Sequence, residues 1–156
     1  MKTTYAIRSM EDRDKEFIIG LSSRFNEFEF MGWREPAKMQ ESQVKIAKEA
    51  VENNDADSDI YVVEGEDGIL LGYLHVCKTT DYFTGVVQGY ISAIVVSKEG
   101  EGKGIAKGLM RKAEEWTKSK GYKQLVLNVF ANNQRAVDFY TYLNYEKEIV
   151  KMVKEL

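Results

Sequence analysis

The residues whose types and spacing are best suited to chemistry form a glycine-rich turn. Gly100, Gly102 and Gly104 alternate with Glu101 and Lys103, between an apolar run and an apolar helical stripe. The first N–H groups of a helix lack intrahelical acceptors, and the helix dipole places partial positive charge on them. Glycine lets phosphate oxygens approach the backbone without a Cβ in the way. The turn therefore predicts an anion site, with a flexible loop that starts a helix as the alternative.

The spacing of these glycines argues against two nucleotide-binding motifs. A dinucleotide-binding turn has the pattern G-x-G-x-x-G, whereas Gly102, Gly104 and Gly108 are spaced G-x-G-x-x-x-G. A P-loop requires Gly-Lys followed by Ser or Thr, and Lys103 is followed by Gly104. Neither motif fits the sequence.

One cysteine and one histidine restrict the other kinds of site. Cys77 cannot form an internal disulfide, and its place in the apolar run 70–77 is typical of a buried, inert thiol. Zinc sites need three or four ligands at defined spacing, so no metal site is expected. His75 alternates with Tyr73 and Cys77 on an expected strand and is interpreted as structural. No G-x-S-x-G elbow accompanies it, which argues against a Ser-His-Asp hydrolase.

Hydrophobic periodicity predicts the elements that position the turn. The expected strands are residues 5–8, 60–63, 69–76, 88–96, 124–130 and 149–153. The expected helices begin at the N-cap Asp12, cover 39–53, run from 105 to a stop at Gly121, and lie around 136–143. This order predicts an α/β (α+β) fold with a mixed, mostly antiparallel central sheet and helices on both faces. With one proline and no linker, we expect a single domain over 1–156.

Composition and charge indicate a globular protein. Hydrophobic residues make up 44% and charged residues 30% of 156 residues, enough for one domain with a sizeable core. The net charge is −3 and lysines are interleaved with glutamates, so no nucleic-acid partner is expected. No run approaches the roughly 20 apolar residues of a membrane span, and the start lacks a secretory signal. A cytoplasmic location without a membrane partner is the expectation.

Two segments carry a family resemblance. Residues 96–106, Val-Ser-Lys-Glu-Gly-Glu-Gly-Lys-Gly-Ile-Ala, resemble the acetyl-CoA motif Arg/Gln-x-x-Gly-x-Gly/Ala of the GNAT superfamily of N-acetyltransferases. Residues 133–140, Asn-Gln-Arg-Ala-Val-Asp-Phe-Tyr, look like the family's Asn-x-x-Ala-x-x-Phe/Leu-Tyr segment. Leu143-Asn144-Tyr145 stands where the family often has Leu-Gly-Phe. The resemblance implies a small bacterial-type member with a GNAT-like acyl-CoA N-acyltransferase fold and acetyl-CoA as cosubstrate.

The resemblance also implies roles for individual residues. Tyr140 matches the family's usual general acid, although on an apolar helical stripe it could simply be packed. Asn133 would contact the cofactor, or cap the last helix. Glu101 occupies a position where the family has Arg or Gln, so we expect its carboxylate to point outward, away from the pyrophosphate. The implied cofactor-binding residues are Ile94, Val95, Val96, Glu101, Gly102, Lys103, Gly104, Ile105, Ala106 and Asn133. Those at 94–96 and 101 would act through their backbone.

The acceptor site is less defined by the sequence. Aromatic residues at 25, 28, 30 and 33 alternate with carboxylates in the family's variable acceptor segment. They could bind an ammonium group through cation–π and ionic contacts, or form the inner side of an irregular helix. The candidate substrate-binding residues are Glu27, Phe28, Trp33 and Tyr82. The general base stays open among Glu27, Glu29, Asp81 and Tyr82, with Ser92 as a residue that could position a water.

The resemblance predicts an acetyl-CoA-dependent N-acetyltransferase that works by direct attack in a ternary complex. Its acceptor would be the primary amine of a small molecule or peptide, such as a polyamine, an amino acid, an aminoglycoside-like compound or a lysine. The alternative is a non-catalytic acyl-CoA-binding sensor or interaction module with the same fold. Exposed sheet edges are compatible with a homodimer.

Overall fold

A five-stranded sheet forms the centre of the molecule, in a computed structural model that describes residues 4–26, 28–53 and 55–156. The strands follow chain order across the sheet: β1 (Tyr5–Ser9), β2 (Ser58–Gly65), β3 (Leu70–Thr80), β4 (Val87–Val96) and β5 (Leu125–Leu127). Neighbours from β1 to β4 pair antiparallel, and β4 pairs parallel with β5. The predicted mixed, mostly antiparallel sheet is confirmed.

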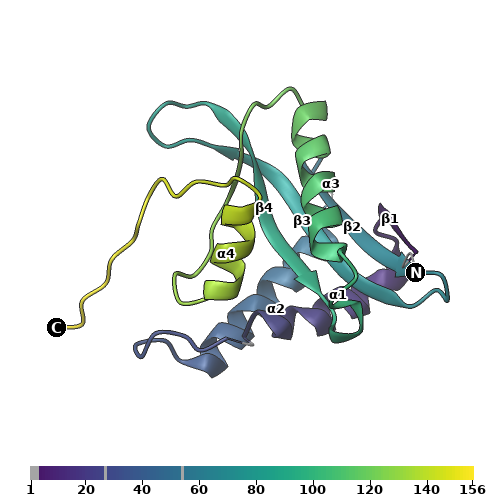
Figure 1. Ribbon diagram of the computed structural model, residues 1–156, viewed down its shortest axis with the longest axis horizontal. Helices are drawn as coiled ribbons and strands as arrows, with labels where there is room; N and C mark the ends of the chain where they lie inside the picture. The colour runs from purple at the N-terminus through teal and green to yellow at the C-terminus, as the bar shows by residue number, and fades with distance from the viewer. Residues whose placement is uncertain (1–3, 27, 54) are drawn as a thin grey trace.

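Helices cover both faces of the sheet, as Figure 1 shows. The helices are α1 (Lys15–Leu21), α2 (Pro36–Glu52), α3 (Ile105–Ser119) and α4 (Gln134–Tyr142), with short 3-10 turns at η1 (Asp12–Asp14), η2 (Ser22–Asn26) and η3 (Lys98–Gly100). α1 and α2 pack on one face, and α3 and α4 pack on the other. Among the described residues, no helix combines the length and apolar character that a membrane crossing requires.

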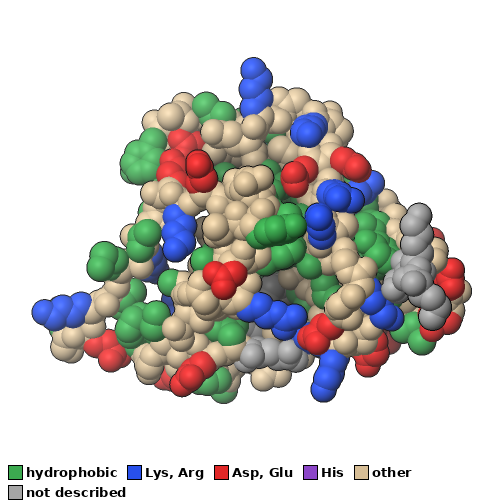
Figure 2. All heavy atoms as spheres, in the orientation of Figure 1, with side chains coloured by type: hydrophobic (Ala, Val, Ile, Leu, Met, Phe, Trp, Pro, Cys, Tyr) green, Lys and Arg blue, Asp and Glu red, His purple; other side chains and the backbone are tan. Residues whose placement is uncertain are grey.

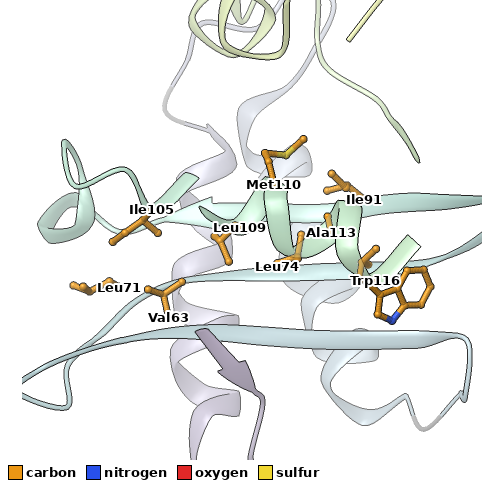
Figure 3. Close-up of a cluster of buried hydrophobic side chains, with 10 residues drawn as sticks. Val63, Leu71, Leu74, Ile91, Ile105, Leu109, Met110, Ala113 and Trp116 are labelled. Atoms are coloured by element: carbon orange, nitrogen blue, oxygen red, sulfur yellow. The ribbon is translucent and has the colours of Figure 1, made fainter. Parts of the chain in front are cut away.

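Two hydrophobic clusters lie on opposite faces because side chains alternate along each strand. Val63 and Leu74 are fully buried against α3, where Leu109 and Trp116 supply the helical side of the cluster (Figure 3). The adjacent side chains Val62 and Tyr73 point to the other face, against α1 and α2. Burying one such side chain contributes about 1.5–3 kcal/mol, so the two clusters fix both helix layers on the sheet.

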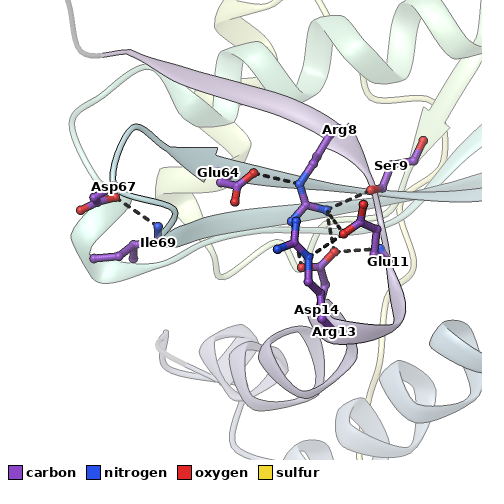
Figure 4. A network of polar contacts seen from close by, with 8 residues as sticks. All are labelled: Arg8, Ser9, Glu11, Arg13, Asp14, Glu64, Asp67 and Ile69. Atoms are coloured by element: carbon purple, nitrogen blue, oxygen red, sulfur yellow. Dashed lines mark hydrogen bonds and ion pairs between the residues drawn. The ribbon is translucent and has the colours of Figure 1, made fainter.

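An ion pair attaches the start of the first helical region to the sheet (Figure 4). Arg8 donates from Nη1 and Nη2 to the two carboxylate oxygens of Asp14, at 2.7 and 3.0 Å, and from Nε to Glu64 at 3.0 Å. Asp14 is 1% exposed and also accepts from the backbone N–H of Glu11. The expectation that Asp12 caps this region is wrong, because Glu11 is the N-cap of η1 and Asp14 is the N-cap of α1.

The C-terminal segment differs most from the sequence prediction. The structure has no strand at 149–153, although every residue of 146–156 is described. After Asn144, whose φ of 71° is left-handed, the chain leaves the body of the molecule (Figure 1). Ile149 and Met152 are 71% and 89% exposed, and hydrophobic side chains project at the left edge of Figure 2. The predicted strand is wrong because this largely apolar segment pairs with no strand of the described sheet.

Candidate functional site

The glycine turn opens towards the N-terminus of α3. Gly102 and Gly104 have left-handed φ values of 74° and 73°, which glycine adopts without the strain that a Cβ would cause. No atom lies within 4 Å of the position of a Cβ at either residue, so a ligand can approach the backbone. Gly104 is the N-cap of α3, and the amides of Ile105, Ala106 and Lys107 therefore lack intrahelical acceptors. This arrangement suits an anion.

Neighbouring strands hold the turn in place. Ser97 donates its N–H to the carbonyl of Leu71 on β3 at 2.8 Å, and its Oγ accepts from the N–H of Gly100 at 3.2 Å. Tyr5 on β1 donates its hydroxyl to the carbonyl of Gly104 at 3.2 Å. The turn is therefore pinned at both ends, so its amides keep their direction when no ligand is bound.

β4 and β5 separate next to the turn. Their parallel pairing ends at Ile91 and Leu127, whereas β4 continues to Val96. The N–H of Ser97 points to β3, and successive N–H groups of a strand point to opposite edges. The amides of Ile94 and Val96 therefore face the gap that opens between the two strands. Such amides can bind a ligand's carbonyl or amide groups.

A β-bulge interrupts β4 beside this gap. His75 of β3 is paired with Ala93, whereas the next residue, Val76, is paired with Ile91, which leaves Ser92 as the extra residue. Bulges bend a strand and redirect its side chains, and they are over-represented next to active sites. The bulge lies where the β4–β5 pairing ends, so it contributes to the separation of the two strands.

One cleft of about 750 Å³ joins the turn, the gap and the inner side of α2. Of the residues predicted from the sequence to act in the site, those that line the cleft are Phe28, Ser92, Ile94, Val95, Val96, Glu101, Ala106, Asn133 and Tyr140. Gly102, Lys103, Gly104 and Ile105 complete the turn without being part of that lining. The structure thus brings the two sequence motifs, about 30 residues apart, to the same cleft.

The residues predicted to bind the acceptor do not all line the cleft. Phe28 lies in an aromatic cluster with Phe30 and Phe130, at ring-centroid distances of 4.5 and 5.7 Å. Tyr82 is 92% exposed in the β3–β4 loop and does not line the cleft. Trp33, at 39% exposed, does not line it either. The candidates Glu29 and Asp81 are also outside the lining, and Glu27 lies outside the described residues, as does the side chain of Phe25.

Tyr140 is held firmly at the cleft by the end of α4. Its carbonyl accepts from the N–H groups of Leu143 and Tyr145, at 3.1 and 3.0 Å. Its ring lies 5.4 and 6.2 Å from those of Phe139 and Tyr145. Burial raises the pKa of Tyr140, so the phenol is protonated at neutral pH. Asn133 caps this helix by accepting from the N–H of Ala136 and also lines the cleft.

The cleft contains residues that sequence reasoning missed. His75 is 8% exposed, lines the cleft, and has Ser58 Oγ 2.7 Å from its Nε2. Burial lowers its pKa, so the ring is neutral at pH 7. On α2, Gln43 also lines the cleft, and its Oε1 is a buried oxygen with no hydrogen-bond donor among the described atoms. Alternation along β3 placed His75 on a strand, but nothing in the sequence indicated the face on which the cleft lies.

The side chain of Glu101 forms an ion pair that the sequence did not indicate. Its carboxylate lies 2.6 Å from the guanidinium of Arg24, and both residues line the cleft. The hydrogen bond from Arg24 lowers the pKa of Glu101, with smaller contributions from the charges of Arg135 and Lys98. The carboxylate is therefore ionised and paired with Arg24.

Comparisons with known proteins agree with this geometry. A family model described as the acetyltransferase (GNAT) family matches residues 23–145. Among solved structures, a proposed acetyl transferase from Pyrococcus furiosus has a TM-score of 0.78 and 28% identity, covering 98% of this chain and 100% of that chain. Glucosamine-6-phosphate N-acetyltransferase from Arabidopsis thaliana shares the fold, with a TM-score of 0.68 and 21% identity over 97% and 98% of the two chains.

Two further relatives are informative. An aminoglycoside N-acetyltransferase in complex with CoA has a TM-score of 0.74 and 18% identity over 99% and 97% of the two chains. N-alpha-acetyltransferase 30 of Schizosaccharomyces pombe is 30% identical over 70 residues, which are 45% of this chain and 47% of that protein. The chain therefore matches about half the length of this curated relative.

Proposed function

The chain belongs to the acetyltransferase (GNAT) family, and we propose that it transfers the acetyl group of acetyl-CoA to a primary amine. The supporting observation is the continuity of one cleft from the glycine turn, through the gap beside β4, to Tyr140. A related fold holds CoA in its solved structure, which supports the choice of cosubstrate. We treat residues 1–156 as one N-acetyltransferase domain.

The turn and the gap have the groups that coenzyme A needs. Pyrophosphate carries negative charge and oxygen acceptors, which match the amides of Ile105, Ala106 and Lys107 at the positive end of α3. A pantetheine arm is extended and rich in amide groups, which match the outward-facing amides of Ile94 and Val96. Asn133 lies in the same cleft, where it can contact the cofactor.

The proposed reaction is direct attack in a ternary complex. The neutral amine nitrogen bonds to the acyl carbon of the thioester, and the C–S bond breaks as the tetrahedral intermediate collapses. Backbone N–H groups of β4 beside the bulge stabilise the oxyanion. Tyr140 donates its phenolic proton to the departing sulfur, while the proton of the amine passes to a base. The products are an N-acetyl amine and the free thiol of CoA.

We propose His75 as that base. It is neutral at pH 7 and lines the cleft, whereas the described carboxylate candidates Glu29 and Asp81 do not. Ser58 orients its ring through Nε2. Ser92, which also lines the cleft at the bulge, can hold a water between the amine and the ring. The sequence alone assigned His75 to the core, because a single histidine on a strand does not indicate whether its side chain faces a cleft.

We propose that the acceptor amine enters past the aromatic cluster of Phe28, Phe30 and Phe130. Arg34 lies over the ring of Phe130 at 5.7 Å, so a cation already contacts this cluster. Aromatic faces can bind a substrate ammonium in the same way. Solved structures with the same fold are named for the acetylation of glucosamine-6-phosphate and of aminoglycosides, so amines of these two kinds belong in the panel to be tested.

The decisive experiment is the release of CoA thiol from acetyl-CoA in the presence of a panel of amines. The panel comprises polyamines, amino acids, amino sugars, aminoglycosides and short peptides, and other acyl-CoA donors are compared with acetyl-CoA. Turnover of one class by the wild type is the expected result. Binding of acetyl-CoA without turnover of any amine would instead favour the acyl-CoA-binding sensor.

We also propose a homodimer, which multi-angle light scattering would test. β5 is an edge strand of the described sheet, and the exposed segment 149–153 is apolar at four of its five positions. A deletion after Tyr145 that leaves the mass of the dimer unchanged would remove this segment from the contact. A cytoplasmic location and the lack of a nucleic-acid or membrane partner stay predictions from the sequence.

A further inference from the structure

Glu101 places a negative charge in the turn that is proposed to hold a pyrophosphate. Glu101 is one of the residues that line the cleft, and it stands at the motif position where the resembling family has Arg or Gln. An unpaired carboxylate there would repel the phosphate groups. Backbone amides can bind phosphate without side-chain charge, but they do not cancel a carboxylate that faces the same space.

Arg24 meets this carboxylate from a distant part of the chain. Its Nη2 lies 2.6 Å from Glu101 Oε1, although the two residues are 77 positions apart. The side chain of Arg24 is 18% exposed and that of Glu101 is 40% exposed, so the pair lies at the mouth of the cleft rather than in open solvent. The short distance and partial burial make this a charge-assisted hydrogen bond in one geometry.

The Arg24–Glu101 ion pair also connects two sides of the cleft. Arg24 lies on η2, and the chain runs from η2 towards Phe28 of the aromatic cluster at the acceptor side of the cleft. The ion pair therefore joins the turn at the cofactor side to the segment at the acceptor side. Arg135 also lines the cleft and adds positive charge near Glu101, but from α4.

We propose that Arg24 is a positioning residue for coenzyme A, which holds the Glu101 carboxylate off the phosphate site and adds a cation beside the turn. This inference rests on the proposed function, because it requires CoA at the turn. The motif allows an arginine at the position of Glu101, whereas here the arginine beside the cofactor site lies on η2. The Arg24–Glu101 pair thereby becomes part of the cofactor site.

The test is calorimetric measurement of the Kd of CoA for four proteins: wild type, Arg24→Gln, Glu101→Gln and the double variant. We expect Arg24→Gln to weaken binding about tenfold, because it leaves the carboxylate unpaired. Glu101→Gln should bind as tightly as the wild type or more tightly. In the Glu101→Gln background, the loss of Arg24 should weaken binding by much less than tenfold, because no carboxylate remains to be held.

Arg111→Gln is the matched control, since it removes the same charge from an exposed residue of α3 that does not line the cleft. It should leave the Kd unchanged. Arg24→Lys, which keeps the charge but not the planar fork, should fall between wild type and Arg24→Gln and serves if the latter fails to fold.

Equal Kd values for wild type and Arg24→Gln overturn the inference while the proposed function stands. An equal loss on removing Arg24 from the wild type and from the Glu101→Gln variant also overturns it, since Arg24 would then act independently of the carboxylate. A wild type that does not bind CoA at all overturns the proposed function itself, and the inference with it.

Discussion

The imidazole of His75 on β3 lies 2.7 Å from the hydroxyl of Ser58 on the adjacent strand β2, at the inner wall of the cleft. Burial lowers the pKa of His75 below its ordinary value near 6.5, against a smaller opposing effect of the charge on Asp59. The neutral ring is thus the form that the fold accommodates. Protonation of His75 should therefore affect both the stability and the activity of the protein.

Stability should depend on pH through His75. The unfolded chain protonates this ring below about pH 6.5, whereas the folded chain resists protonation, so the unfolded state binds more protons there. The free energy of unfolding of the wild type should therefore fall as the pH drops from about 7 to about 5. His75→Gln should flatten that part of the profile, measured by urea unfolding at several pH values. An identical slope in both proteins would show that other groups cause the dependence.

The pH dependence of activity should also follow the protonation of His75 if His75 is the base. The rate at low substrate should decline on the acid side of the profile, at a pH below about 6.5, because the protonated ring cannot accept a proton. His75→Gln should lower kcat by about 10²- to 10⁴-fold and remove that acid limb. A full rate in this variant would return the base to the sequence candidates, with Ser92→Ala and Glu27→Gln as the next variants to measure.

Tyr140→Phe should lower kcat with little change in acetyl-CoA binding. The ring still packs against Phe139 and Tyr145, so only the proton donor is lost. A reduction of about 10²- to 10⁴-fold is expected for a general acid, measured by thiol release under saturating substrate. Tyr142→Phe is the control, because Tyr142 is on the same helix but 74% exposed. An unchanged kcat for Tyr140→Phe would remove Tyr140 from the mechanism.

Asp14→Asn should destabilise the protein by about 3 kcal/mol, because it leaves the Arg8 guanidinium without its buried partner. The hydrogen bond from Arg8 lowers the pKa of Asp14, so the wild type should also lose this stability as the pH falls through the lowered pKa. Asp12→Asn, at a side chain that is 97% exposed, should change stability by less than about 0.5 kcal/mol. Equal effects of the two substitutions, in urea unfolding, would contradict this assignment.

Gln43→Met should stabilise the free protein by about 1 kcal/mol, because it replaces a buried oxygen that has no donor by an apolar group of similar size. If the amine acceptor donates to this oxygen, its KM should rise in the variant while that of acetyl-CoA stays constant. The exposed Gln40→Met on the same helix is the matched control. A loss of stability in thermal unfolding would indicate that the oxygen is satisfied in solution.

Much of the fold and half of the site follow from local sequence patterns. The strand-like apolar runs 60–63 and 69–76 predicted β2 and β3, and the stripe from Ile105 to Trp116 predicted α3, because each pattern depends on neighbours a few residues away. The glycine spacing predicted the turn, since Gly102 and Gly104 adopt φ values that other residues avoid. Membership of the acetyltransferase family, predicted from two motifs, is confirmed by the family match.

Only the tertiary structure decided which distant residues meet. It paired Glu101 with Arg24, brought His75 into the cleft, left Tyr82 exposed, and left 149–153 without a partner strand. A glycine's φ is set by local sterics, so the sequence by itself determined the turn. The charge that faces the turn is set by how η2 packs against it, and packing between segments 77 positions apart leaves no periodic trace in the sequence.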